Sequence, residues 1–265
     1  MLSLLASRSG VAQEQLEREI REVHQRRNTS EYSYLLNELP SLRQLHGDEV
    51  DLMVEYDDVL HVLYSGRKHN TELYKGVLET LRYVRAQGVP VVAYTESIAY
   101  WTARRVRDVG LDGLLNVLYS SPDHDWPAGV SPEDVRFHPP EAYGLKVTEH
   151  SKVPRGVTKP NSDVLTIILD DYKIAPTQAV YVGDSLTKDI VMAQAAGVHD
   201  AWAAYGVSDG RPEYALLRRV SHWPDDVIER EREAAEGQLA VTPSYTLQNF
   251  SELLELFHFQ PMNDL

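Results

Sequence analysis

The chain has 265 residues, and its 40 Asp and Glu residues outnumber its 26 Lys and Arg residues, which gives a formal net charge of −14. This acidic balance argues against general binding to nucleic acid, and no apolar run approaches the ~20 residues that a membrane span needs. The absence of cysteine excludes disulfides, thiolate metal sites and a cysteine nucleophile. We therefore expect a cytoplasmic protein that acts on a small molecule. The sequence does not indicate an oligomeric state.

Residues 1–70 have a helical pattern and contain little Gly or Pro. Leu16, Ile20 and Val23 recur near helical spacing, and charged residues stand between them. Two further apolar patches follow, at 32–45 and at 50–63. The pattern predicts a small helical module over residues 1–70.

From residue 71 onward, short apolar runs alternate with helical patterns of about ten residues. The expected helices span 73–87, 98–109, 162–172 and 187–196, and the expected strands span 89–94, 116–119, 179–183 and 201–205. A connection rich in Pro, His and Gly occupies about 122–158. Buried strands that alternate with helices are typical of an α/β fold with a parallel, Rossmann-like sheet and flanking helices. We predict such a domain over residues 71–265.

Ligands bind at the carboxyl ends of the strands in such sheets, so the residues after each strand are the candidates for a site. Thr95, Glu96 and Ser97 follow the expected strand 89–94. A hydroxyl beside free N–H groups at the start of a helix suits an anion. Taken alone, Thr95 or Ser97 is as well explained as a helix cap.

Two carboxylates bracket the turn after the expected strand 179–183. Asp184 and Asp189 are oxygen ligands of the kind that Mg²⁺ prefers, and Gly183 allows close approach of the backbone. The alternative is that Asp184 is a turn residue and Asp189 a cap or an ion-pair partner. Lys159 precedes the helix 162–172, where an ordinary surface lysine is the alternative.

In combination and in this order, the three motifs resemble the haloacid dehalogenase superfamily. Its second, third and fourth motifs match Thr95 in VVAYTES, Lys159 in TKPNSDVL, and Asp184 with Asp189 in YVGDSLTKDI. The resemblance covers residues 71 to about 255. It implies a Rossmann-like core and a mobile cap, and the helical module 1–70 stands where a helical cap is expected.

The resemblance also implies a function. Most members are Mg²⁺-dependent phosphohydrolases that form an aspartyl-phosphate, and the general style here is that of phosphoglycolate phosphatases acting on a small phosphorylated metabolite. By analogy, Thr95 holds a phosphoryl oxygen, with Glu96 and Ser97 beside it in the substrate site. Lys159 offsets negative charge and Asp184 binds Mg²⁺. Asp189 either supports the metal or orients Lys159.

The first motif of the family, a strand that ends in Asp-x-Asp and supplies the nucleophile, is not found. Asp57 and Asp58 are adjacent, and Asp123-His124-Asp125 follows the Thr95 motif and reads as a loop. We therefore expect residues 1–265 to be inactive by themselves. The family's strand would lie between the strands that end at Tyr94 and Val182, and its loss would leave unpaired backbone groups at about 1–3 kcal/mol each. One hypothesis is that the chain is an N-terminally shortened form of a longer protein.

Two other readings remain open. One is a non-catalytic relative that keeps the fold and uses the site for binding. The other is an unrelated α/β protein in which the motifs coincide by chance, so that Thr95, Lys159 and Asp184 do not converge. The charged run 229–233 is expected to form a solvated helix face.

Overall fold

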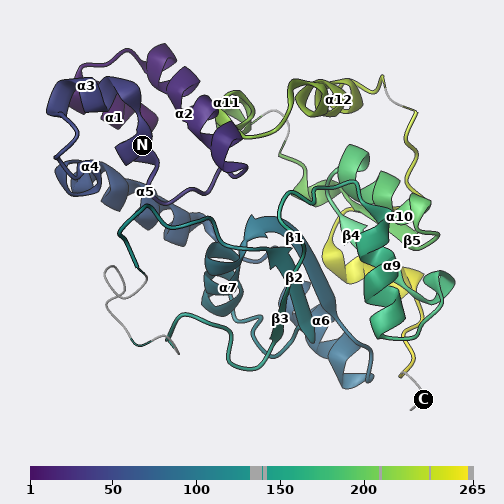
Figure 1. Ribbon diagram of the computed structural model, residues 1–265. Helices are drawn as coiled ribbons and strands as arrows, with labels where there is room; N and C mark the ends of the chain where they lie inside the picture. Colours follow the sequence, from purple (N-terminus) through teal and green to yellow (C-terminus); the bar gives the residue numbers. More distant parts are fainter. Residues whose placement is uncertain (132–138, 140–141, 209–210, 239, 262–265) are drawn as a thin grey trace. The chain divides into compact units, whose positions relative to one another are not determined.

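The structure is a computed structural model, and it describes residues 1–131, 139, 142–208, 211–238 and 240–261 (Figure 1). It divides into two compact units. Unit 1 comprises Met1–Glu72, Asp123–Tyr143 and Gly210–Trp223, and unit 2 comprises Leu73–Pro122, Gly144–Asp209 and Pro224–Leu265. In the described part of the chain, no helix combines the length and the apolar character needed to span a membrane.

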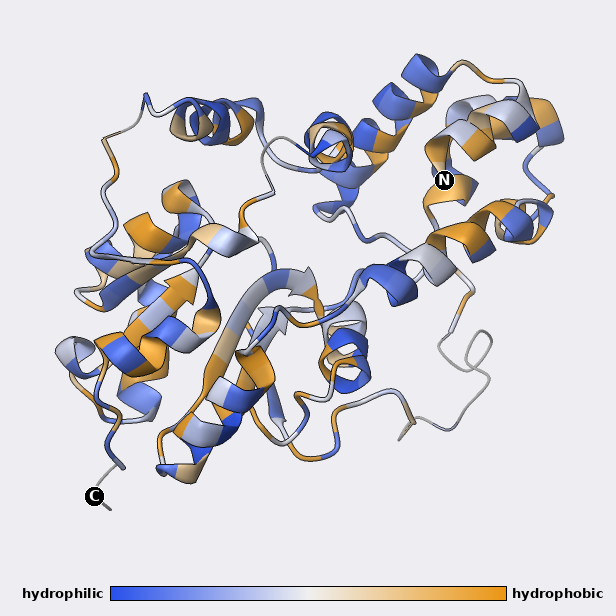
Figure 2. Cartoon of the chain, turned by 180° about the vertical axis from the view of Figure 1, so that it is seen from behind, coloured by the Kyte–Doolittle hydropathy of each residue, from blue (hydrophilic) through white to orange (hydrophobic). Residues whose placement is uncertain are grey.

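Unit 1 is helical, as predicted for residues 1–70. Its elements are α1 (Leu2–Ser9), α2 (Gln13–Arg27), the 3-10 helix η1 (Leu35–Glu38), α3 (Pro40–His46), α4 (Leu52–Glu55), α5 (Asp57–Asn70) and α11 (Pro212–Val220). The helices carry both apolar and polar positions, as Figure 2 shows by colour. This amphipathic character lets each helix bury one side.

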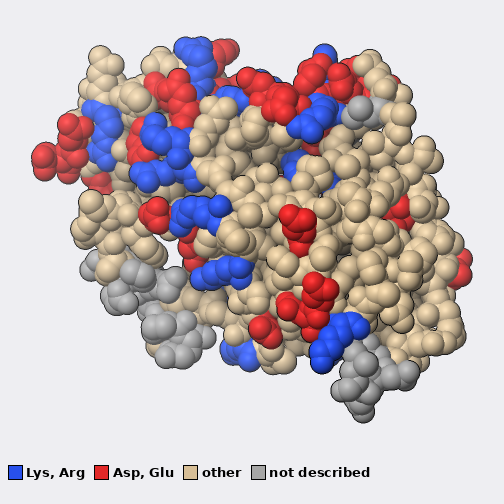
Figure 3. Space-filling model, turned by 45° about the vertical axis from the view of Figure 1, so that its right-hand side comes forward, with Lys and Arg blue, Asp and Glu red and all other residues tan. Residues whose placement is uncertain are grey.

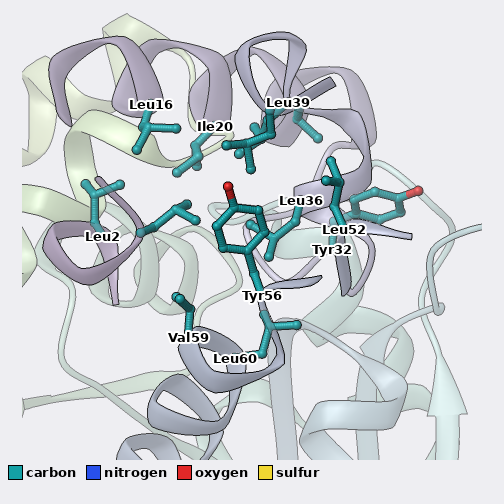
Figure 4. Close-up of a cluster of buried hydrophobic side chains, with 13 residues drawn as sticks. Leu2, Leu16, Ile20, Tyr32, Leu36, Leu39, Leu52, Tyr56, Val59 and Leu60 are labelled. Carbon is teal, nitrogen blue, oxygen red and sulfur yellow. The ribbon is translucent and has the colours of Figure 1, made fainter. Parts of the chain in front are cut away.

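The core of unit 1 is a cluster of leucines around Tyr56 (Figure 4). Leu16, Ile20 and Val23 project from α2 into this cluster at the spacing that the sequence predicts. α11 packs on α2, where Arg219 Nε lies 2.7 Å from Glu17 Oε2. A distant segment of the chain thereby completes the helical unit.

Unit 2 contains two three-stranded sheets. One has the order β1 (Val92–Ile98), β2 (Val117–Ser121), β3 (Glu149–Lys152), and the other has the order β4 (Val180–Gly183), β5 (His199–Ala203), β6 (Tyr245–Leu247). Every pairing is parallel, as predicted. β1 and β4 each lie at an end of their sheet. That a further strand of the family would lie between β1 and β4 stays a prediction.

Helices cover both faces of these sheets. The remaining elements of unit 2 are α6 (Val77–Ala86), α7 (Ala99–Asp108), α9 (Ser162–Asp171), η3 (Pro176–Gln178), the π-helix η4 (Leu186–Ile190), α10 (Val191–Ala195), η5 (Ala204–Gly206), α12 (Asp225–Ala235), η6 (Phe250–Glu252) and α13 (Leu253–Leu256). Val106 of α7 packs with Leu118 of β2 on one face. α9 packs against Tyr119 of β2 through Val164 and against Tyr181 of β4 through a second cluster. α9 therefore contacts both sheets.

Four local predictions need correction. Residues 95–97 lie inside β1, where the register shifts, so that these three residues stand opposite the single residue Ser120 of β2. The expected helix 187–196 divides into the π-helix η4 and the α-helix α10, because its first turn has π rather than α geometry. The expected connection 122–158 contains β3, while its residues 132–138 and 140–141 lie outside the described residues. The strand β6 was not expected, because its three residues form too short a run for an alternating pattern to stand out.

Two leucines of α3 provide a test of the core of unit 1. Leu42 is fully buried, whereas Leu45 is 55% exposed. Leu42→Ala is expected to lower the free energy of unfolding by about 2–5 kcal/mol, because it leaves a cavity. Leu45→Ala should change it by no more than about 0.5 kcal/mol. Urea unfolding followed by circular dichroism measures both, and equal losses would contradict the packing of α3.

Candidate functional site

The centre of the site is a buried ion pair between Lys159 and Asp189. Lys159 Nζ lies 2.9 Å from Asp189 Oδ1 and donates to Tyr181 Oη at 2.8 Å. The Tyr181 hydroxyl donates to the same carboxylate oxygen at 3.1 Å. The two charged side chains are only 12% and 7% exposed. Burial opposes the charged form of Lys159, but its contacts with Tyr181 and Asp189 outweigh that effect and raise its pKa.

The backbone after β4 is shaped to receive Asp189. A Cβ atom added at Gly183 would lie 2.3 Å from Asp189 Cβ, so only glycine fits there without displacement. The N–H of Ser185 donates to Asp189 Oδ2 at 3.1 Å, and the Ser185 hydroxyl accepts from the N–H of Lys188 at 3.2 Å. These bonds fix the Asp189 carboxylate, and through it the ammonium of Lys159.

Asp184 lies at the carboxyl end of β4 and is exposed, in contrast to Asp189. Its carbonyl oxygen accepts a hydrogen bond from Trp202 Nε1 at 3.0 Å, which ties the end of β4 to β5. Within the described residues, no side chain is hydrogen-bonded to the carboxylate of Asp184. Although the side chain reaches the surface, surrounding protein desolvates the carboxylate, and this effect together with the Asp189 charge raises the pKa of Asp184.

A second ionic group lies beside the first. Glu96 Oε1 accepts a hydrogen bond from the backbone N–H of Lys159 at 2.6 Å. Lys188 Nζ lies 3.7 Å from Glu96 Oε2 and 3.7 Å from Glu231 Oε1. The Ser185 hydroxyl also donates to Glu231 Oε1, at 3.2 Å. β1, η4 and α12 thus meet at one buried lysine.

The structure brings Lys159, Asp189 and Glu96 into direct contact, and Asp184 lies close enough to interact electrostatically with the first two. Thr95 adjoins Glu96 in β1, and its Oγ1 accepts a hydrogen bond from the N–H of Ser97 at 3.1 Å. This local bond lies within β1 and is not a helix cap, because Ile98 is the N-cap residue of α7 and no side chain caps that helix. It uses the oxygen of Thr95 as an acceptor and leaves the hydroxyl hydrogen available to donate.

The linked groups carry an excess of negative charge that suits a cation. They comprise four carboxylates, from Asp184, Asp189, Glu96 and Glu231, and two ammonium groups, from Lys159 and Lys188. No group of three or more His, Cys, Asp or Glu side chains that could hold a metal occurs in the part of the chain that the structure describes. A Mg²⁺ ion usually takes one or two carboxylates and completes its shell with water and phosphate. The exposed carboxylate of Asp184 fits that requirement, whereas both oxygens of Asp189 already accept hydrogen bonds.

Three members of the site were not predicted from the sequence. Glu231 was expected on a solvated helix face, but it is only 8% exposed and contacts Lys188 and Ser185. Tyr181 lies between two valines of β4. A hydroxyl in an otherwise apolar strand was the one indication in the sequence that Tyr181 could belong to the site. Lys188 lies inside the fourth motif and gave no separate signal.

Comparison with known proteins agrees with the resemblance in the motifs. A family model described as HAD-hydrolase-like, where HAD denotes haloacid dehalogenase, matches residues 157–234. A phosphoglycolate phosphatase of Pseudomonas putida is 28% identical over 168 residues, which cover 63% of this chain and 50% of the relative. These two matches support a HAD-superfamily, phosphatase-like protein. It spans about half the length of this curated relative.

Solved HAD structures are similar at a lower level. A HAD phosphatase from Thermococcus onnurineus gives a TM-score of 0.49 at 14% identity, over 98% of this chain and 88% of that one. The HAD-hydrolase YfnB from Bacillus subtilis, bound to magnesium, gives 0.47 at 15% identity, over 92% and 79%. The family model and the curated relative, rather than these structures, support the predicted superfamily. The roles of the individual site residues stay predictions.

Two glycines of unit 2 test how tightly Asp189 is held. Gly183→Ala is expected to lower the free energy of unfolding by about 1–3 kcal/mol, because the new methyl group overlaps Asp189. Gly144→Ala adds a methyl group where no atom lies within 4 Å, and it should have little effect. Denaturant unfolding compares the two. Similar stability of both variants would show that Gly183 does not constrain Asp189.

The raised pKa of Asp184 gives a second test. A carboxyl whose pKa is raised in the folded state favours folding below its ordinary pKa, and that contribution is lost as the pH rises through the raised value. Asp184→Asn is therefore expected to raise the Tm of the metal-free protein at pH 7, with the difference shrinking in acid. Thermal denaturation in EDTA measures this. Asp226→Asn, at an exposed position of unit 2, is the control, and an unchanged Tm for Asp184→Asn would contradict the electrostatic account.

Proposed function

We propose that the chain carries the phosphate- and Mg²⁺-binding part of a HAD-type phosphohydrolase. The observation that supports this most directly is the fixed ammonium of Lys159 among carboxylates that outnumber the cations around them. A phosphate ester needs positive charge on its oxygens as the bond to phosphorus breaks. Lys159 would supply one such charge, and the Thr95 hydroxyl would donate to a phosphoryl oxygen.

Asp184 would hold the Mg²⁺ ion, which supplies further charge neutralisation of the phosphoryl group when it is bound. Asp189 would orient Lys159, since its oxygens already accept from Lys159, Tyr181 and Ser185. The motif left two possible roles for Asp189, metal support or orientation of Lys159, and this geometry favours orientation. Ser97 would complete the anion site beside Thr95.

A nucleophile is the part that these residues do not supply. Asp57 and Asp58 belong to the first turn of α5 in unit 1. His124, between Asp123 and Asp125, packs against Tyr32 with ring centroids 4.9 Å apart. We therefore propose that residues 1–265 bind phosphate without turning over a phosphate ester, and that a carboxylate outside them completes the reaction.

The substrate is proposed to be a small phosphorylated metabolite in the cytoplasm. The name of the Pseudomonas putida relative, a phosphoglycolate phosphatase, supports this class. On the face shown in Figure 3, Lys and Arg are interspersed with Asp and Glu, an arrangement that does not favour nucleic acid. The helices of residues 1–70 are proposed to act as the cap of the family.

Binding of inorganic phosphate tests the proposal directly. Isothermal titration should detect phosphate binding to residues 1–265 that strengthens in the presence of Mg²⁺. Asp184→Asn should remove the Mg²⁺ effect because it neutralises the proposed ligand, and Lys159→Met should weaken phosphate binding at every Mg²⁺ concentration. Turnover of p-nitrophenyl phosphate should be absent.

Each result distinguishes the alternatives. No phosphate binding by the folded protein would refute the proposed function. Binding that ignores both Mg²⁺ and Asp184→Asn would favour the non-catalytic binding protein instead. Turnover by residues 1–265 would show that a nucleophile is present among them after all.

A further inference from the structure

The second ionic group, formed by Glu96, Lys188 and Glu231, makes a contact with Lys159 that packing alone does not explain. One carboxylate oxygen of Glu96 accepts a hydrogen bond from the backbone N–H of Lys159 at 2.6 Å, and the other lies 3.7 Å from Lys188 Nζ. The Lys159 residue is thus held twice: its ammonium by Asp189 and Tyr181, and its backbone by Glu96. The two holds come from different sheets, because Glu96 belongs to β1 and Tyr181 to β4.

We propose that Glu96 is a positioning residue that sets the location of the Lys159 ammonium, and that Lys188 and Glu231 keep the Glu96 carboxylate in place. This inference rests on the proposed function of Lys159 in phosphate binding. It gives Glu96 a role different from the direct substrate contact expected from its place beside Thr95.

Burial makes the arrangement specific. The side chains of Lys188 and Glu231 are each 9% exposed, and that of Glu96 is 20% exposed. A carboxylate removed from water to this degree needs a cation or hydrogen-bond donors nearby. Lys188 is equally distant from both carboxylates, so it serves each of them. The Ser185 hydroxyl adds a donor to Glu231.

The same contacts link α12 to the site. Glu231 is the buried residue of α12, and its carboxylate contacts both Lys188 and Ser185 in the turn that carries Asp189. Ser185 in turn donates its backbone N–H to Asp189. Glu231 is therefore linked to Lys159 by two routes. One runs through Lys188 and Glu96, and the other runs through Ser185 and Asp189.

Substitutions at Glu96 separate positioning from simple electrostatics. Removing a carboxylate near a bound phosphate should tighten binding if charge alone matters. Glu96→Ala, which also removes the acceptor for the Lys159 N–H, is instead expected to weaken phosphate binding by about 10-fold or more, the effect of losing one charge-assisted hydrogen bond. Glu96→Gln retains an acceptor oxygen and should bind phosphate at least as tightly as the unsubstituted protein.

Two readouts decide the inference. The first is the dissociation constant of inorganic phosphate, measured at saturating Mg²⁺ so that any change in Mg²⁺ affinity does not enter the comparison. The second is hydrogen exchange of the Lys159 amide by NMR, which should be slow in the unsubstituted protein and in Glu96→Gln, and fast in Glu96→Ala. Glu229→Gln, at an exposed position of the same helix as Glu231, is the control and should change neither.

Lys188→Met provides an independent variant if Glu96→Ala does not fold. It leaves the Glu96 carboxylate without its cation, so it should accelerate exchange of the Lys159 amide. The acceleration should be smaller in a Glu96→Gln background, where no charge remains to be compensated.

The outcomes separate this inference from the function on which it rests. Absence of phosphate binding by the unsubstituted protein refutes the proposed function, while the exchange data still decide whether Glu96 holds Lys159. Phosphate binding that is intact or tighter in Glu96→Ala, or an unchanged exchange rate, overturns the positioning role and leaves the proposed function standing.

Discussion

The arrangement of the site depends on one buried ion pair, Lys159 with Asp189. Breaking such a pair by removing one partner costs about 3–5 kcal/mol, because a charge is left without compensation. A domain is stable by only ~5–15 kcal/mol, so this pair is a large part of the margin of unit 2. The glycine at 183, the hydroxyl of Tyr181 and the N–H of Ser185 all serve to keep that pair intact.

The pair also connects the two sheets. Lys159 Nζ lies 4.8 Å from the ring centroid of Tyr94 in β1 and 5.5 Å from that of Tyr181 in β4. α9, whose capping residue Asn161 follows Lys159 closely in the chain, packs on the same two strands. Since the described strands of the two sheets do not hydrogen-bond to each other, side chains rather than backbone join them here. The hydroxyl of Tyr94 is buried and has no hydrogen-bond partner in the described residues. Joining the sheets through side chains therefore leaves one polar group unsatisfied.

The sequence predicted most of this fold where the pattern was local. The apolar period of α9 and the valines of β4 were sufficient to place both elements. β3 has the sequence EHSK and lies at the end of its sheet, so it lacks the apolar alternation on which a strand prediction depends. The bulge in β1 at residues 95–97 depends on pairing with β2, which no local pattern contains.

The same distinction applies to the site. The motif residues were found because their spacing is characteristic, and their chemistry is recognisable one by one. Glu231 was missed because its neighbours 229, 230 and 232 are charged residues on an exposed helix surface, and periodicity alone does not say which member of such a run faces a buried lysine. Tertiary contact decides that choice.

The site contains more carboxylates than ammonium groups, and this excess of negative charge needs a physical reason. Four carboxylates against two ammonium groups leave repulsion that packing alone would not select. Burial raises the pKa of Asp184 first, and the charge of Asp189 adds to that effect. Natural sequences accept such destabilisation where binding needs it. A divalent cation would remove the excess of two charges, so the feature that weakens the metal-free protein is the one that would give the cation its affinity.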